Sequence, residues 1–190
     1  MQLLADDRAR VQAAQAAAQA RTQARFATMI VPVSDRYEMY ALAFAGAAAM
    51  AVGGALAFFW QEIGLRLGFL VEAAAFGVTA VAFDWRPLKL TLVPKLMQQA
   101  RARAMAHREF AAGILAAKDH GEGLLFFASL GERYVEIVAS REVHARIGEA
   151  AWSRIVSEFS TRAKTDLPGA FVEAIQSCAD LLATHFPRAA

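Results

Sequence analysis

The chain has little cysteine, few prolines and no excess of charge of either sign. One cysteine among 190 residues, Cys178, excludes an intrachain disulfide framework and a metal site made only of cysteines. No zinc-type spacing of histidines occurs, and there is no phosphate-binding glycine loop or nucleophile elbow. The 20 basic and 18 acidic residues leave a net charge of +2, which gives no support to nucleic-acid binding. The commonest metal, nucleotide and nucleic-acid sites are therefore not expected.

What the chain has in excess is apolar sequence, concentrated in one region. Hydrophobic residues make up 57% of the chain and charged residues 20%. The run from Tyr40 to Trp60 holds 21 residues without a formal charge, long enough to cross a hydrocarbon layer of ~30 Å. A second apolar segment, Leu67 to Phe83, follows after a short turn and is interrupted only by Glu72. Together the two segments predict a transmembrane helical hairpin.

The alternative is a pair of buried helices in a soluble bundle, but the first uncharged run is long for an ordinary core helix. Charges beside the two runs predict the orientation, because basic residues concentrate on the cytoplasmic side. The turn between the runs carries Arg66 alone, whereas eight basic residues flank the hairpin: Arg21, Arg25, Arg36, Arg86, Lys89, Lys95, Arg101 and Arg103. We therefore expect both termini on the cytoplasmic side of a bacterial-type inner membrane.

Glu72 is the one ionisable residue well inside a predicted span, and such a group is costly in hydrocarbon. It lies within two turns of the interface, so pairing with Arg66 or reaching toward the headgroups is expected to satisfy it. Small residues such as Gly46, Gly53 and Gly77 let helices approach closely. They predict packing within the hairpin and leave a homo-oligomer open.

Segments on both sides of the hairpin predict the rest of the fold. Residues 6–22, rich in alanine, glutamine and arginine, predict a helix, and residues 26–33 predict a nearly continuous apolar strand, of the kind buried on both faces. After the hairpin we expect an amphipathic helix over 96–114. Its apolar stripe is expected to contain Leu96, Ala100, Ala104, His107, Ala111 and Ile114.

Two strands and two helices are expected to close the chain. Residues 124–130 (LLFFASL) form a mainly apolar strand, and residues 133–139 alternate apolar and polar after a tight turn, which predicts a β-hairpin. Asp166, with Pro168 after it, is the expected N-cap of the last helix. The apolar stripes of the two helices are Trp152, Ile155, Val156 and Phe159, then Phe171, Ile175, Cys178 and Leu182.

If strand 26–33 lies parallel to strand 124–130, the connection between them is a crossover into which the membrane hairpin is inserted. The expected fold class is then α/β, a small sheet flanked by helices and interrupted by a transmembrane hairpin. Its parts would be 1–36 (helix and strand), 37–86 (hairpin) and 87–190 (helix, β-hairpin and two helices).

The segment GEGLLFFASLGERYVEIVASREVHARI, Gly121 to Ile147, resembles the signature of TPM-domain proteins. In that family an apolar strand meets a short turn and a strand of the form R-x-V-x-I. The earlier stretch FATMIVPVSDRY is similar to the family's first strand, and one membrane subgroup carries two spans between the halves of the domain. The resemblance implies a small TPM-like sheet with helices on its faces.

The same resemblance implies two kinds of activity. Some plant members are described as thylakoid-lumen acid phosphatases, and others act in membrane-complex maintenance or receptor assembly. The phosphatase-type members usually carry a DNG and a DDR pattern, where this chain has Gly121-Glu122-Gly123 and Gly131-Glu132-Arg133. Both aspartates are therefore replaced, which disfavours metal binding and phosphoryl chemistry.

Glu122 and Glu132 are the candidates for a catalytic role or for holding a divalent cation through carboxylate oxygens. They flank the two ends of one strand, too far apart to share an ion. The alternative for Glu132, with Arg133 beside it and Glu136 nearby, is a set of surface ion pairs that contribute little.

The sequence favours an integral membrane protein whose cytoplasmic TPM-like domain binds a protein partner, in membrane-complex assembly or maintenance. The ERYVEI hairpin and the helix with Trp152 form the expected recognition surface. The alternative is a metal-assisted phosphatase at the membrane surface. Small-molecule transport ranks third, because two spans are too few to line a pathway. Expected partners are the lipid bilayer and an unidentified protein, with no cofactor unless a divalent cation binds.

Overall fold

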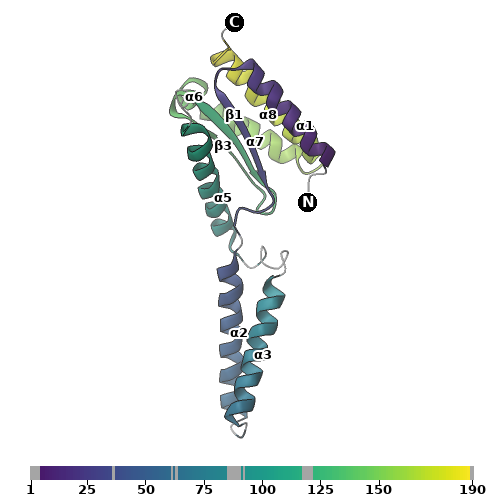
Figure 1. Ribbon diagram of the computed structural model, residues 1–190, viewed down its shortest axis with the longest axis vertical. Helices are drawn as coiled ribbons and strands as arrows, with labels where there is room; N and C mark the ends of the chain where they lie inside the picture. The colour runs from purple at the N-terminus through teal and green to yellow at the C-terminus, as the bar shows by residue number, and fades with distance from the viewer. Residues whose placement is uncertain are drawn as a thin grey trace. The chain divides into compact units, whose positions relative to one another are not determined.

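The computed structural model describes residues 5–35, 37–60, 62, 64–84, 91, 93–116 and 122–188 (Figure 1). The chain forms two compact units, one made of Met1–Ser34 with Gln99–Ala190 and the other of Asp35–Gln98. The first unit, called the sheet unit below, is a small mixed sheet flanked by helices. The second unit holds two long apolar helices. The chain thus leaves the sheet unit, forms the helical pair and returns.

Three strands make the sheet, in the order β1-β2-β3: β1 (Arg25–Val31), β2 (Gly123–Ser129) and β3 (Tyr134–Ala139). β1 runs parallel to β2, and β2 runs antiparallel to β3. The parallel pairing confirms that the long connection between β1 and β2 is a crossover. All seven residues of β2 are buried, as its continuous apolar sequence predicts for a central strand covered on both faces.

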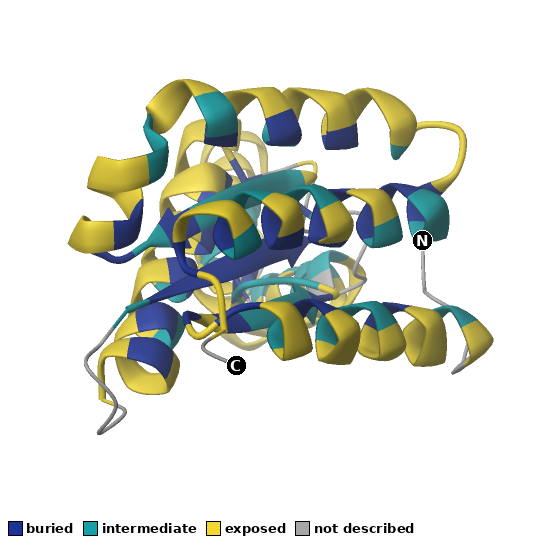
Figure 2. Ribbon diagram, turned by 90° about the horizontal axis from the view of Figure 1, so that it is seen from above, coloured by how far each residue is buried: buried dark blue, intermediate teal, exposed yellow. Residues whose placement is uncertain are grey.

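One face of the sheet is covered by the helices α1 (Ala5–Arg21), α7 (Glu149–Arg162) and α8 (Leu167–His185). The larger core lies here and centres on aromatic rings. The Phe126 ring of β2 lies 5.4 Å from that of Phe159 and 6.1 Å from that of Phe171, between ring centroids. Figure 2 shows the buried residues gathered on the sheet and on the helix faces turned toward it.

The other face is covered by α5 (Lys95–Phe110) and its π-helical continuation η1 (Ala111–Leu115), opposite α1 and α8 in Figure 1. The buried apolar residues of this helix are Ala102, Ala106, Phe110 and Ile114. The predicted apolar stripe is therefore wrong except at its end, because these other members are exposed: Leu96, Ala100, Ala104, His107 and Ala111. Alanines lie on every face of this helix, so the large Phe110 side chain decides which face is buried.

A short helix, α6 (Arg141–Ile147), precedes α7, so three helices follow β3 where two were predicted. The predicted start of α8 is confirmed, since Asp166 Oδ1 accepts a hydrogen bond of 3.0 Å from the Gly169 N–H and Pro168 lies in the first turn. Cys178 is fully buried on the core face of α8, and burial raises the pKa of its thiol to about 12. That thiol is therefore a neutral core residue.

The helices of the second unit are α2 (Glu38–Phe59) and α3 (Leu65–Asp84), and both are long and apolar enough to cross a membrane. They pack along one another, and the buried residues of α2 are the small Ala41, Ala45 and Ala49, spaced four apart. Most of their apolar surface is otherwise exposed, since no more than 6% of either apolar stretch is buried. A core helix of a soluble bundle would bury it, so this exposure favours a lipid environment.

Candidate functional site

Glu132 lies in the turn between β2 and β3, where its carboxylate is buried. Oε1 accepts hydrogen bonds from the Ser34 N–H at 2.9 Å and from the Ser34 hydroxyl at 2.7 Å. Oε2 accepts a hydrogen bond from the Ser129 hydroxyl. The carboxylate thus fastens the chain leaving β1 to the β2–β3 turn. The expectation of a surface pair for Glu132 is wrong, because the loop after β1 folds over it.

Glu122 lies at the opposite end of β2, just before its first residue, Gly123. It is half-buried, and its backbone oxygen accepts a hydrogen bond of 3.0 Å from the Arg25 N–H. The whole strand therefore separates Glu122 from Glu132, and the structure does not bring the two candidates together. Within the described ranges, no group of three or more histidine, cysteine, aspartate or glutamate side chains is placed to hold a metal ion.

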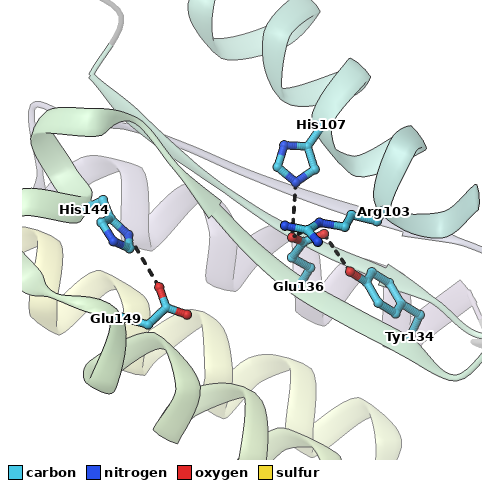
Figure 3. Close-up of polar contacts among 6 residues, drawn as sticks. All are labelled: Arg103, His107, Tyr134, Glu136, His144 and Glu149. Atoms are coloured by element: carbon cyan, nitrogen blue, oxygen red, sulfur yellow. Dashed lines mark hydrogen bonds and ion pairs between the residues drawn. The ribbon is translucent and has the colours of Figure 1, made fainter. Parts of the chain in front are cut away.

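A cluster of polar side chains joins α5 to β3 around Glu136 (Figure 3). Glu136 Oε1 lies 3.2 Å from His107 Nε2 and 3.6 Å from Arg103 Nε. The Tyr134 hydroxyl donates to Oε2 at 2.8 Å, and burial together with the Glu136 carboxylate raises the pKa of this phenol. Tyr134 is therefore a neutral donor, and three side chains contact the Glu136 carboxylate. The prediction that His107 belongs to the apolar stripe is corrected here.

We expect Glu132→Gln to lower the free energy of unfolding by about 2 kcal/mol, since an amide NH2 would replace one of the two acceptor oxygens in a buried site. Urea unfolding of the full chain, with Trp60 and Trp85 replaced by phenylalanine so that fluorescence reports Trp152, measures this. Glu136→Gln is the matched control and should cost less, about 1 kcal/mol or under, because two of its three partners, Arg103 and His107, are largely exposed. An unchanged stability of Glu132→Gln would contradict the fastening role.

The outer edge of β1 is open along part of its length. The Arg25 N–H bonds to Glu122 O and Val31 O accepts from the Leu130 N–H, so odd-numbered residues of β1 face β2 and even-numbered ones face outward. At Phe26 the outward N–H is occupied by Gln19 Oε1 at 2.7 Å. In the part of the chain that the structure describes, the outward backbone groups of Thr28 and Ile30 have no hydrogen-bond partner.

Two residues limit this open edge. Gln19 closes it at the beginning of β1, because its side chain both accepts from Phe26 and donates to the Ala24 oxygen at 3.1 Å. Pro32 follows the strand and has no N–H to offer, which is typical of edge strands. The open edge is thus short and centred on Thr28 and Ile30. The sequence did not predict this open edge, because residues 26–33 were predicted only to be buried on both faces. Pro32 was the only sequence signal of an edge strand.

A hollow of about 730 Å³ lies around the beginning of β1, walled by α1 and η1. Because α1 and η1 cover opposite faces of the sheet, a hollow that contacts both must wrap the edge strand. Its α1 wall presents amides at three- and four-residue spacing: Gln12, Gln15 and Gln19. Arg25 and Glu122 add one charge of each sign. Amides both donate and accept hydrogen bonds, so the lining matches an extended peptide backbone.

The expected recognition surface is only partly available. Trp152 is 3% exposed and packs in the core, so it does not present a surface to a partner. Most residues of β3 are half-buried. Edge strands bind extended peptides through backbone hydrogen bonds, with side-chain pockets beside them. The open edge of β1 and the hollow beside it, together called the β1 groove below, are therefore the better candidate.

The fold and the groove define a class: a mostly helical protein with a small three-stranded mixed sheet and two apolar helices. Comparison with protein-family models, curated proteins and solved structures found no match to this chain. The likeness to the TPM-domain family therefore rests on residues such as Gly121 to Ile147 alone.

Proposed function

We propose that this chain is an integral membrane protein in which α2 and α3 anchor a TPM-like domain to a bacterial-type inner membrane, with both termini in the cytoplasm. The exposed apolar surface of the two helices supports the anchoring. The basic residues on both sides of the hairpin support the orientation. The parallel pairing of β1 with β2 supports a domain into which the hairpin is inserted.

The domain binds a protein partner, and an extended segment of that partner adds to β1 as a further strand. The observation that carries this proposal is the β1 groove, where open backbone groups lie beside an amide-lined hollow. Pairing between two copies of β1 would centre on Thr28 and Ile30 and leave the hollow at Arg25 unfilled. A partner segment that pairs with β1 and continues past its beginning fills both the open edge and the hollow. Such binding suits a role in membrane-complex assembly or maintenance.

A photo-crosslinking amino acid at Gln15 tests the proposal in cells. We expect a crosslink that mass spectrometry maps to an extended segment of another protein. Thr28→Pro should abolish it, since proline removes the outward N–H. Thr28→Val is the matched control, because it keeps that N–H and removes a buried hydroxyl that has no partner among the described residues. A crosslink that maps to a second copy of the chain would replace the proposal with a dimer.

The phosphatase alternative has a separate test. Hydrolysis of a phosphomonoester that requires a divalent cation and is lost in Glu122→Ala would support it.

For the crosslinking experiment, the same probe at exposed Ser157 of α7 controls for surface proximity. Equal crosslinking from Gln15 and Ser157 would count against the β1 groove.

A further inference from the structure

Glu72 lies two turns inside α3 with its carboxylate against α2. A Cβ atom on Gly53 would lie 2.8 Å from Glu72 Oε1, so the glycine makes the room that the carboxylate occupies. Among the described residues, Glu72 has no hydrogen bond or ion pair, and neither has Arg66. The expected pairing of Glu72 with Arg66 is therefore corrected. An acidic group remains without a protein partner inside an apolar hairpin.

The carboxylate faces a hollow of about 470 Å³ between the two helices. One wall runs from Gly53 of α2 to Trp60, the C-cap of that helix, and the other runs from Leu65 to Glu72 of α3. Each wall is one face of two helical turns, because its members repeat at three- and four-residue spacing. Apart from Glu72, the lining is apolar, aromatic or glycine. The volume falls within the range of small-molecule pockets.

We propose that this hollow binds a lipophilic organic cation, with the Glu72 carboxylate as its counter-ion and the rings of Trp60 and Phe69 against its apolar surface. An ionised carboxylate in hydrocarbon is costly unless it takes up a proton or a positive charge accompanies it, and a bound cation supplies that charge. Aromatic rings attract organic cations through the negative charge of their faces. Trp60 and Phe69 are 65% and 68% exposed, so the hollow is open toward the surrounding lipid.

Other occupants fit the hollow less well. Calcium takes six or more oxygen ligands, and magnesium demands octahedral coordination, whereas the lining supplies one carboxylate. A small organic cation needs one counter-ion and apolar contact, and both are present.

The inference rests on the placement of α2 and α3 in lipid, as proposed above, and not on the β1 groove. The two can fail separately. Loss of membrane insertion would be seen without any ligand, and loss of cation binding would be seen in a chain that is correctly inserted.

Equilibrium dialysis of the full chain in detergent micelles with tetraphenylphosphonium as the probe tests the site. We expect saturable binding of one cation per hollow, weakened about tenfold or more by Glu72→Gln. Glu62→Gln, at an exposed position between the helices, is the matched control and should bind like the unaltered chain. Tetraphenylborate has the same shape and the opposite charge, and it should not compete.

A second pair of variants separates the site from general effects on the hairpin. Gly53→Ala displaces the Glu72 carboxylate and should weaken binding, whereas Gly54→Ala, where an added Cβ meets nothing within 4 Å, should not. The bound cation should also protect Glu72 from modification by a hydrophobic carbodiimide, detected by mass spectrometry. Equal binding by the unaltered chain and Glu72→Gln, or equal binding of the borate, would overturn the proposal as partition into detergent.

Discussion

Replacing Met50 by arginine should prevent most of the protein molecules from inserting into the membrane. Met50 lies near the middle of α2 and is 76% exposed. An arginine at the centre of a spanning helix costs about 2.5–3.5 kcal/mol on insertion, roughly a hundredfold in the equilibrium. On an exposed helix of a soluble protein the same change would be harmless. The fraction of the chain retained in alkali-washed membranes measures the effect.

Met39→Arg is the control for this experiment. Met39 is 77% exposed but lies in the first turn of the same helix, where an arginine side chain can reach the interface. Its insertion should be close to that of the unaltered chain. If Met50→Arg stays in washed membranes as fully as Met39→Arg does, α2 does not face lipid at its centre, and the anchoring proposal fails.

The parts of the fold that sequence predicted well depend on neighbouring residues. The two apolar helices follow from runs too long and too free of charge for a core helix. Asp166 caps α8 as predicted, because a cap is a contact between residues only three positions apart in the sequence. The burial of β2 on both faces follows from its nearly continuous apolar sequence.

What sequence could not supply are contacts between distant segments. Ser34 and Glu132 are 98 positions apart, and nothing near either residue signals their hydrogen bonds. The face of α5 was misassigned because its alanines form no clear stripe, so His107 was placed in the core although it lies beside Glu136. Both errors concern which segment packs against which, a property of the assembled sheet.

The candidate site shows the same limit. A strand's sequence does not say which of its edges a neighbour will cover, so the open edge of β1 emerged only with the order of the sheet. Similarly, Arg66 and Glu72 are close enough along α3 to suggest a pair, yet the Glu72 carboxylate lies against Gly53 of the facing helix. Sequence identified Glu72 as a residue to explain, and the packing of α2 on α3 supplied its surroundings.

Phe126→Ala and Phe127→Ala should each lower the free energy of unfolding by about 3–5 kcal/mol, a large part of the 5–15 kcal/mol usual for a domain. The two residues are adjacent in β2 and point to opposite faces of the sheet, and both are fully buried. Phe126 packs under α7 and α8, whereas Phe127 packs under α5. Urea unfolding followed by Trp152 fluorescence, with Trp60 and Trp85 replaced by phenylalanine, measures both.

The pair distinguishes a sheet covered on both faces from one covered on a single face. If α5 packs on the sheet as described, Phe127→Ala leaves a cavity beside Ala106 and Phe110 and costs as much as Phe126→Ala. Phe127→Leu keeps most of the buried volume and should cost less, which separates the cavity from loss of the fold. If Phe127→Ala leaves the free energy of unfolding unchanged while Phe126→Ala lowers it, the face of the sheet assigned to α5 is open. The crossover through α5, and with it the insertion of the hairpin into a single domain, would then be wrong.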